Sequence, residues 1–184
     1  VVHQARLAQY ADYGRNAVDA LTETEELANA QLERLDRALD DDRAEALRKR
    51  AAALYDRFNE TFWWEGEGTY YLALDGEKKP VKSVASNAGH LLGSGIVPPD
   101  RAKRVVDRLM QPDMWSGWGI RTLSTQNPAY NPFSYQRGSI WPHDNGIIAA
   151  GFKHYGLNEE ANKVIRGSFD AARRFDAYRL PEVY

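Results

Sequence analysis

Residues 130–145 constrain the fold more than any other stretch of the chain, because they fit neither a helix face nor a strand. Aromatic, amide, acidic and basic side chains crowd together here, with Pro132, Gly138 and Pro142 between them. The stretch runs directly into an apolar segment, 147–152, whose composition predicts a buried helix. A polar, aromatic loop on a rigid scaffold is typical of a functional site. The competing interpretation is a packed loop whose tryptophan only caps the core.

The residue types of this loop suit the binding of a sugar. Aromatic faces stack on the C–H surface of a sugar ring, while Asn, Asp, Arg and His side chains hydrogen-bond its hydroxyl groups. A ligand cleft needs a few well-placed polar groups among apolar walls, and this loop supplies both kinds. The stretch is therefore the first candidate for a binding site.

Most of the remaining chain has the periodicity of helices. Residues 2–39 carry apolar positions at steps of three and four, which favours two helices of a helical domain over a long coiled coil. The next apolar stripe predicts a helix that ends near Phe62. Further helices are predicted at 86–92, 101–110, about 144–155 and 158–175, with Pro99 and Asp100 suited to a helix start.

Two parts of the chain are not predicted to be helical. Residues 69–74 read as a short strand that Asp75 and Gly76 turn towards Pro80 and Val81, which indicates one hairpin. Residues 111–140 are loop-rich. Long helices joined by such loops fit stacked α-hairpins, whose loops gather at one end.

Composition excludes several kinds of partner and chemistry. A formal net charge of −2 gives no reason to expect nucleic acid or an anionic membrane as partner. No apolar run reaches the ~18 residues that a membrane span requires, and we expect a cytoplasmic protein. The absence of cysteine removes disulfides, zinc thiolate sites and cysteine nucleophiles. The histidines lack the spacing of a metal site, so we expect neither a metal nor another cofactor.

Several motifs in a fixed order carry a resemblance to a known family. The pattern Tyr-Asn-Pro-x-Ser-Tyr-x-x-Gly-Ser-x-Trp-Pro-His-Asp-Asn at residues 130–145 is similar to a signature of bacterial amylo-α-1,6-glucosidase (glycogen-debranching-type) proteins. The similarity extends across at least Phe58 to Tyr184. It also includes the motifs at 58–60, 62–63, 86–92, 116–124 and 180–182.

This resemblance implies a fold. The family belongs to the six-hairpin glycosidases, so the expected fold is all-α, part of an (α/α)6 toroid, with a small β-hairpin insertion. Residues 1–184 would form the C-terminal portion of the catalytic domain. The chain starts without methionine and stops directly after a loop motif, so we expect it to be a fragment of a longer enzyme.

The resemblance also implies a catalytic residue. Glycoside hydrolysis generally needs two carboxyl groups, one as acid and one as base or nucleophile. The Pro-Glu motif at 181–182 implies that Glu182 is the general base of an inverting mechanism. The family's general acid lies in a Gly-Trp-Lys-Asp-like loop that is absent here, and we expect it upstream of Val1. Asp144 is the alternative acid, although it lies in a motif expected to bind a sugar hydroxyl or to cap the following helix.

The expected substrate-binding residues come from two loops and one helix start. Trp118 is either a stacking platform or core, and the glycines beside it let the backbone approach a ligand. Arg121 either contacts sugar hydroxyls, keeps a catalytic carboxylate ionised or forms a structural ion pair. His90 is either a pocket residue or a satisfied structural histidine. The remaining candidates are Tyr135, Arg137, Trp141, His143 and Asp144.

The expected function is hydrolysis of α-glucosidic bonds in an oligo- or polysaccharide, of the amylo-α-1,6-glucosidase type. A trehalase-like or other oligosaccharide α-glucosidase remains an alternative, although Gln136 stands where some of those relatives have Trp. Alternatives of another class are an inactive carbohydrate-binding fragment and a sugar epimerase, which would need His90 and His143 for proton transfer. The isolated fragment, without its general acid, is expected to be inactive.

Overall fold

The computed structural model describes residues 31–32, 34–35 and 41–184. The chain divides into two compact units, Val1–Ala53 and Leu54–Tyr184, and the second contains every candidate site residue. Apart from four helical residues, the helices predicted for 2–39 lie outside the described part. Helix α2, Asp41–Thr61, ends one residue before the predicted end.

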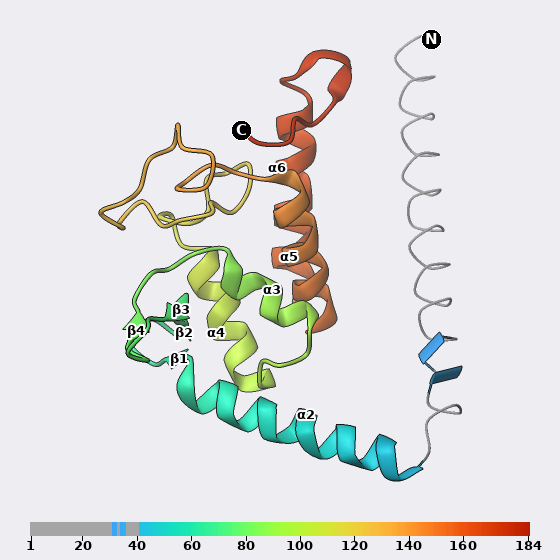
Figure 1. Ribbon diagram of the computed structural model, residues 1–184. Helices are drawn as coiled ribbons and strands as arrows, with labels where there is room; N and C mark the ends of the chain where they lie inside the picture. Colours follow the sequence, from blue (N-terminus) through green and yellow to red (C-terminus); the bar gives the residue numbers. More distant parts are fainter. Residues whose placement is uncertain (1–30, 33, 36–40) are drawn as a thin grey trace. The chain divides into compact units, whose positions relative to one another are not determined.

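Four helices in the second unit follow the predicted order. They are α3 (Asn87–Gly93), α4 (Pro99–Leu109), α5 (Pro142–His154) and α6 (Asn158–Ala172), which Figure 1 shows gathered side by side. Prolines open both α4 and α5, where their missing N–H costs no hydrogen bond. Helix α5 therefore begins at Pro142 rather than near residue 144, and the end of the loop motif forms its first turn.

The β structure is more extensive than predicted, with two hairpins in place of one. Strands β1 (Trp63–Trp64) and β2 (Thr69–Tyr70) form one antiparallel hairpin, and β3 (Ala73–Leu74) and β4 (Pro80–Val81) form another. The expected strand at 69–74 is thus split, because its first half pairs backwards with the residues that follow α2. The fold expectation is confirmed as helix-rich with small hairpins. A closed ring of six helical hairpins is not formed by residues 41–184.

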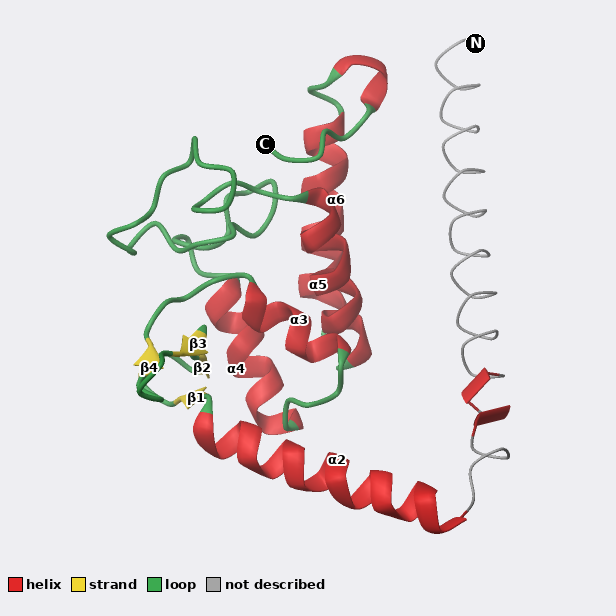
Figure 2. Ribbon diagram, in the orientation of Figure 1, coloured by secondary structure: helices red, strands yellow, loops and turns green. Residues whose placement is uncertain are grey.

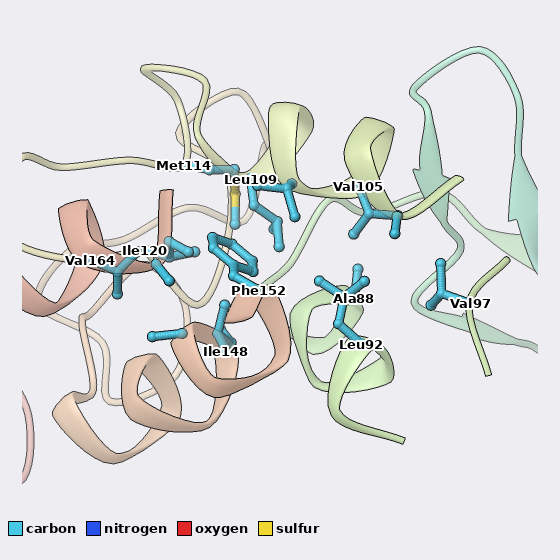
Figure 3. Close-up of a cluster of buried hydrophobic side chains, with 14 of the residues drawn as sticks. Ala88, Leu92, Val97, Val105, Leu109, Met114, Ile120, Ile148, Phe152 and Val164 are labelled. Atoms are coloured by element: carbon cyan, nitrogen blue, oxygen red, sulfur yellow. The ribbon is translucent and has the colours of Figure 1, made fainter. Parts of the chain in front are cut away.

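The core lies between α3, α4, α5 and α6 (Figure 3). Helices α3 and α5 approach so closely that a Cβ on Gly89 would lie 2.7 Å from Ile148 Cγ1, and one on Gly151 would lie 2.9 Å from Leu92 Cβ. Glycine at both positions is what permits this distance. The fully buried apolar residues of this core include Leu92, Val105, Leu109, Met114, Ile120, Ile148, Phe152 and Val164.

The segment between α4 and α5 has little regular structure, as predicted (Figure 2). Its shape depends on buried polar side chains. Asn145, from the first turn of α5, is 1% exposed; its Oδ1 accepts from the Ile120 N–H at 2.6 Å. Its Nδ2 donates to the carbonyls of Ile120 and Trp141 at 3.1 and 3.0 Å. One amide therefore holds two parts of the segment together.

A buried ion pair holds the start of the same segment. Arg108, at the end of α4, donates to both oxygens of Asp113 at 2.9 Å and to Glu67 at 2.8 Å. The Ser124 hydroxyl also donates to Asp113. Burial acts to raise the pKa of Asp113, but the hydrogen bonds from Arg108 and Ser124 outweigh it and hold the pKa below its usual value.

We expect Asn145→Ala to lower the free energy of unfolding by about 3 kcal/mol, because it leaves buried backbone groups of Ile120 and Trp141 unpaired. Denaturant unfolding measures the loss. The half-buried Asn127, which bonds Ser83 and its own loop, provides the matched control. Asn127→Ala is expected to cost about 1 kcal/mol or less. Equal losses in the two variants would contradict the role given to Asn145.

Replacing Asp113 by Asn is expected to cost about 3 kcal/mol near neutral pH, because Arg108 then lacks its bidentate partner in a buried site. The pKa of Asp113 is lowered in the folded protein, so its stabilising effect is present above the ordinary value of 3.8 and is lost as pH falls through the lower, folded pKa. The stability difference between wild type and Asp113→Asn should therefore stay constant above pH 3.8 and shrink as the pH falls from 3.8 through the folded pKa of Asp113. Urea denaturation at stepped pH tests this, and a difference independent of pH would refute it.

Candidate active site

The first loop of the candidate site is a tight turn at residues 116–119. The Ser116 hydroxyl donates to the Gly119 carbonyl at 2.7 Å and accepts from the backbone N–H groups of Trp118 and Gly119 at 3.1 Å. Gly117 has φ +93°, which L side chains rarely adopt. The turn holds Trp118 36% exposed, with the Arg174 guanidinium 5.7 Å from its ring centre. Trp118 is thus partly open, with a cation near its ring.

The second loop carries the motif at residues 130–141. Gly138 has φ +140°, and a Cβ there would lie 2.4 Å from the Tyr130 ring. The chain folds back on itself at this point, because the Asn131 N–H donates to the Arg137 carbonyl at 2.7 Å. This geometry explains the glycine of the motif.

The end of the chain lies against this second loop. Ile140 and Tyr184 exchange two backbone hydrogen bonds, of 2.6 and 2.9 Å, and the Tyr184 hydroxyl donates to the Trp118 carbonyl at 3.3 Å. Arg121 forms an antiparallel bridge with Ile140 on its other side. Residues from three distant parts of the sequence therefore meet at Ile140.

This arrangement brings Glu182 to the aromatic residues of the motif. The Tyr135 hydroxyl donates to Glu182 Oε1 at 2.8 Å. The Tyr135 ring packs edge-on against Trp141, with ring centres 4.6 Å apart, and its carbonyl accepts from the Trp141 indole N–H at 3.1 Å. The hydrogen bond to Glu182 raises the pKa of Tyr135. An acid and two aromatic side chains thus form one contiguous group.

An open hollow of about 330 Å³ lies beside Trp141. At its wall, Asp144 Oδ1 is hydrogen-bonded to His90 Nε2 from α3, while Asp144 Oδ2 is buried without a partner in the described part. The N-cap position of α5 is Trp141, with no side-chain capping bond, so the expectation that Asp144 caps the helix is wrong. The residues lining the hollow are Ser86, Asn87, Thr122, Gln136, Trp141, His143 and Asp144.

Some of the site residues predicted from the sequence lie at the hollow, and others do not line it. His143 and Asp144 line the hollow, and His90 reaches it through Asp144. Arg121 makes no ion pair with the described residues and donates only weakly, to the Met114 carbonyl at 3.4 Å. Arg137 is exposed and donates to the Ser134 hydroxyl at 3.3 Å. The structural ion pair considered for Arg121 is therefore not found in this part of the chain.

Sequence reasoning misses the residues that position the site. Asn145 stands out in the sequence only as part of the motif, and Tyr184 not at all, although both bond directly to the site loops. An amide at a helix start, next to an apolar run, is the available signal for Asn145. No local pattern points to Tyr184, because its partners lie far away in sequence.

Two properties of the described residues bear on other chemistry. They contain no group of three or more His, Cys, Asp or Glu side chains close enough to hold a metal ion. Among residues 41–184 and the four described before them, no helix is long and apolar enough to cross a membrane.

A protein family model covers nearly the whole of this chain, and individual known proteins resemble parts of it. The model of the mannosylglycerate hydrolase MGH1-like glycoside hydrolase domain matches residues 5–183. Mannosylglycerate hydrolase MGH1 of Selaginella moellendorffii is 29% identical over 91 residues, which cover 49% of this chain and 19% of that protein. The chain thus spans about a fifth of the length of this curated relative.

Solved structures of glycoside hydrolases share part of this chain's fold. The GH63 mannosylglycerate hydrolase of Thermus thermophilus, in complex with Tris and D-glycerate, matches with a TM-score of 0.58 and 22% identity over 68% of this chain and 30% of its own. Neutral trehalase Nth1 of Saccharomyces cerevisiae matches with a TM-score of 0.64 and 12% identity over 74% of this chain and 26% of its own. At these identities the likeness shows the fold alone.

The family match supports the coarser part of the resemblance seen in the sequence, a glycoside hydrolase domain. It does not specifically support an amylo-α-1,6-glucosidase. The match extends over nearly the whole sequence, and this chain belongs to the family of MGH1-like glycoside hydrolase domains.

Proposed function

We propose that the protein containing this chain hydrolyses a glycosidic bond with inversion, and that Glu182 is its general base. The observation that carries the proposal is the bond between Tyr135 and Glu182, which holds an acidic side chain close to Trp141, against whose ring Tyr135 packs. A carboxylate next to a sugar-stacking surface is what an inverting glycosidase needs on the water side of the ring.

In the proposed reaction, Glu182 takes a proton from a water molecule while the oxygen of that water bonds to the anomeric carbon. The bond from that carbon to the leaving oxygen breaks, its electron pair stays on the leaving oxygen, and a second carboxyl group protonates it. We place this second carboxyl group outside residues 1–184. Trp118 and Trp141 are proposed to stack on the sugar, and His143 and the His90–Asp144 pair to face its hydroxyl groups.

For the substrate we propose a small α-glycoside with a negatively charged aglycone, of which mannosylglycerate is the first to test. Family members are named as mannosylglycerate hydrolases. Arg121, two residues after the first site loop, and Arg137, in the second, form no ion pair with any residue of the described part. A guanidinium binds a carboxylate in bidentate fashion. Unpaired cations at a sugar site favour a charged leaving group over a neutral glucan.

Hydrolysis of α-1,6 branches remains the second candidate, favoured by the motif at 130–145. Trehalose hydrolysis is the third, favoured by the shared fold of neutral trehalase. The three candidates differ in the charge and size of the leaving group. An assay with mannosylglycerate, trehalose, maltose and branched limit dextrin separates them.

Glu182→Gln in the full-length protein is expected to lower kcat by about 10²–10⁴-fold on the preferred substrate, the usual contribution of one general base. Released sugar is measured enzymatically, and NMR of the first product anomer shows inversion or retention. Glu159→Gln, an exposed change on α6, serves as the control and should leave the rate unchanged. An unchanged rate in Glu182→Gln would rule out Glu182 as base, and a retained anomer would rule out inversion.

Arg137→Gln is expected to raise KM for mannosylglycerate about tenfold, because a hydrogen bond to a charged group is worth about 1.5–3 kcal/mol, and to leave KM for an uncharged α-mannoside unchanged. Steady-state kinetics on the charged and uncharged pair measures the difference. Lys153→Gln, in the last turn of α5, removes a positive charge elsewhere and is the matched control. A loss of equal size on both substrates would contradict carboxylate recognition by Arg137.

A further inference from the structure

The carboxylate of Glu182 is held at a single point. Its hydrogen bond from the Tyr135 hydroxyl, at 2.8 Å, is the one bond this carboxylate makes within the described residues, and the side chain is otherwise exposed. A glutamate on an exposed segment has several side-chain torsions free, and ordering such a side chain costs conformational entropy. A general base needs its oxygen at a fixed place relative to the attacking water.

The backbone near Glu182 is fixed separately. The two hydrogen bonds between Ile140 and Tyr184 hold the main chain two residues further on. They set where the Glu182 backbone lies but not the direction of its carboxylate. That direction is left to the Tyr135 hydroxyl.

Tyr135 is itself held at both ends. Its carbonyl accepts from the Ser139 hydroxyl at 2.7 Å and from the Trp141 indole N–H at 3.1 Å. Its ring packs at 69° against the Trp141 ring. The loop therefore already orients the phenol ring of Tyr135. Forming the bond to Glu182 needs little further ordering of the tyrosine.

We propose, on the basis of the function assigned to Glu182, that Tyr135 is a positioning residue for this carboxylate rather than a sugar-binding residue. The phenol O–H occupies Oε1 of Glu182 and leaves Oε2 free to take the proton of the water. The protonated phenol is the form that donates. A neighbouring carboxylate that accepts this hydrogen bond favours the protonated form at neutral pH.

Tyr135→Phe tests the proposal, because it removes only the hydroxyl and keeps the ring against Trp141. In the full-length protein we expect kcat to fall about 10- to 100-fold, the loss that follows removal of one hydrogen bond to a charged group, with KM changed less than about twofold. Tyr130→Phe is the matched control in the same loop, since its hydroxyl has no partner among the described residues. A raised KM with an unchanged kcat would overturn the proposal and restore the sugar-binding role.

A double-mutant cycle separates positioning from a general structural effect. If Tyr135 acts through Glu182, then Tyr135→Phe should cost little in a protein that already carries Glu182→Gln. Equal fold losses from Tyr135→Phe in both backgrounds would show that the two side chains act independently and would overturn the proposal.

A third measurement does not depend on activity, so it distinguishes failure of this inference from failure of the proposed function. NMR of protein labelled with ¹³Cζ-tyrosine follows the titration of Tyr135, assigned through the signal missing in Tyr135→Phe. The hydrogen bond to Glu182 raises the pKa of Tyr135, so Glu182→Gln should move that pKa back towards its ordinary value of 10.0. An unchanged titration would show that the pair does not form. A protein that hydrolyses none of the glycosides but shows the shift would refute the proposed function and keep the contact.

Discussion

The buried amide of Asn145 is the interaction on which the candidate site depends. It accepts from and donates to the backbone of Ile120, and it donates to the carbonyl of Trp141. An amide has just enough donors and acceptors to serve both loops at once. Asn145 belongs to the first turn of α5, and this helix is packed into the core. The hydrogen bonds of Asn145 therefore fix the loops relative to the core. The irregular segment is therefore held in place at Ile120 and Trp141, next to the candidate site residues.

The second consequence concerns the short stretch around Ile140. One backbone neighbour is Arg121, which follows the Trp118 turn, and the other is Tyr184, which follows Glu182. The segment that carries Trp141 thus lies between the loop with the first aromatic residue and the segment with the proposed base. Glu182, Tyr135 and the two tryptophans therefore lie on or next to hydrogen-bonded stretches of backbone, so the distances between them do not depend on long flexible side chains alone.

The sequence predicts local structure well in this chain and long-range pairing poorly. Helices α3 to α6 follow from apolar periodicity and from prolines at helix starts. Helices α4 and α5 begin about two residues earlier than predicted, α6 ends at Ala172 rather than at 175, and the hairpins are more extensive. The contacts of the site join residues far apart in sequence: 54 positions separate His90 from Asp144, and 47 separate Tyr135 from Glu182. No periodicity encodes such pairs. Family motifs place the residues in one region, but they do not reveal that Tyr135 points at the acid.

The His90–Asp144 pair shows how core packing determines the polarity of the hollow. His90 lies on α3 and Asp144 on α5, and these helices can approach only because Gly89 and Gly151 lack a side chain at their contact. A larger residue at either position would push the helices apart and separate the imidazole from the carboxylate. Asp144 Oδ2 is buried without a donor among the described residues, so the bond to His90 compensates the carboxylate only in part. An unpaired carboxylate oxygen is costly to stability, and Asp144, a half-buried residue, lies at the wall of the hollow rather than in the apolar core.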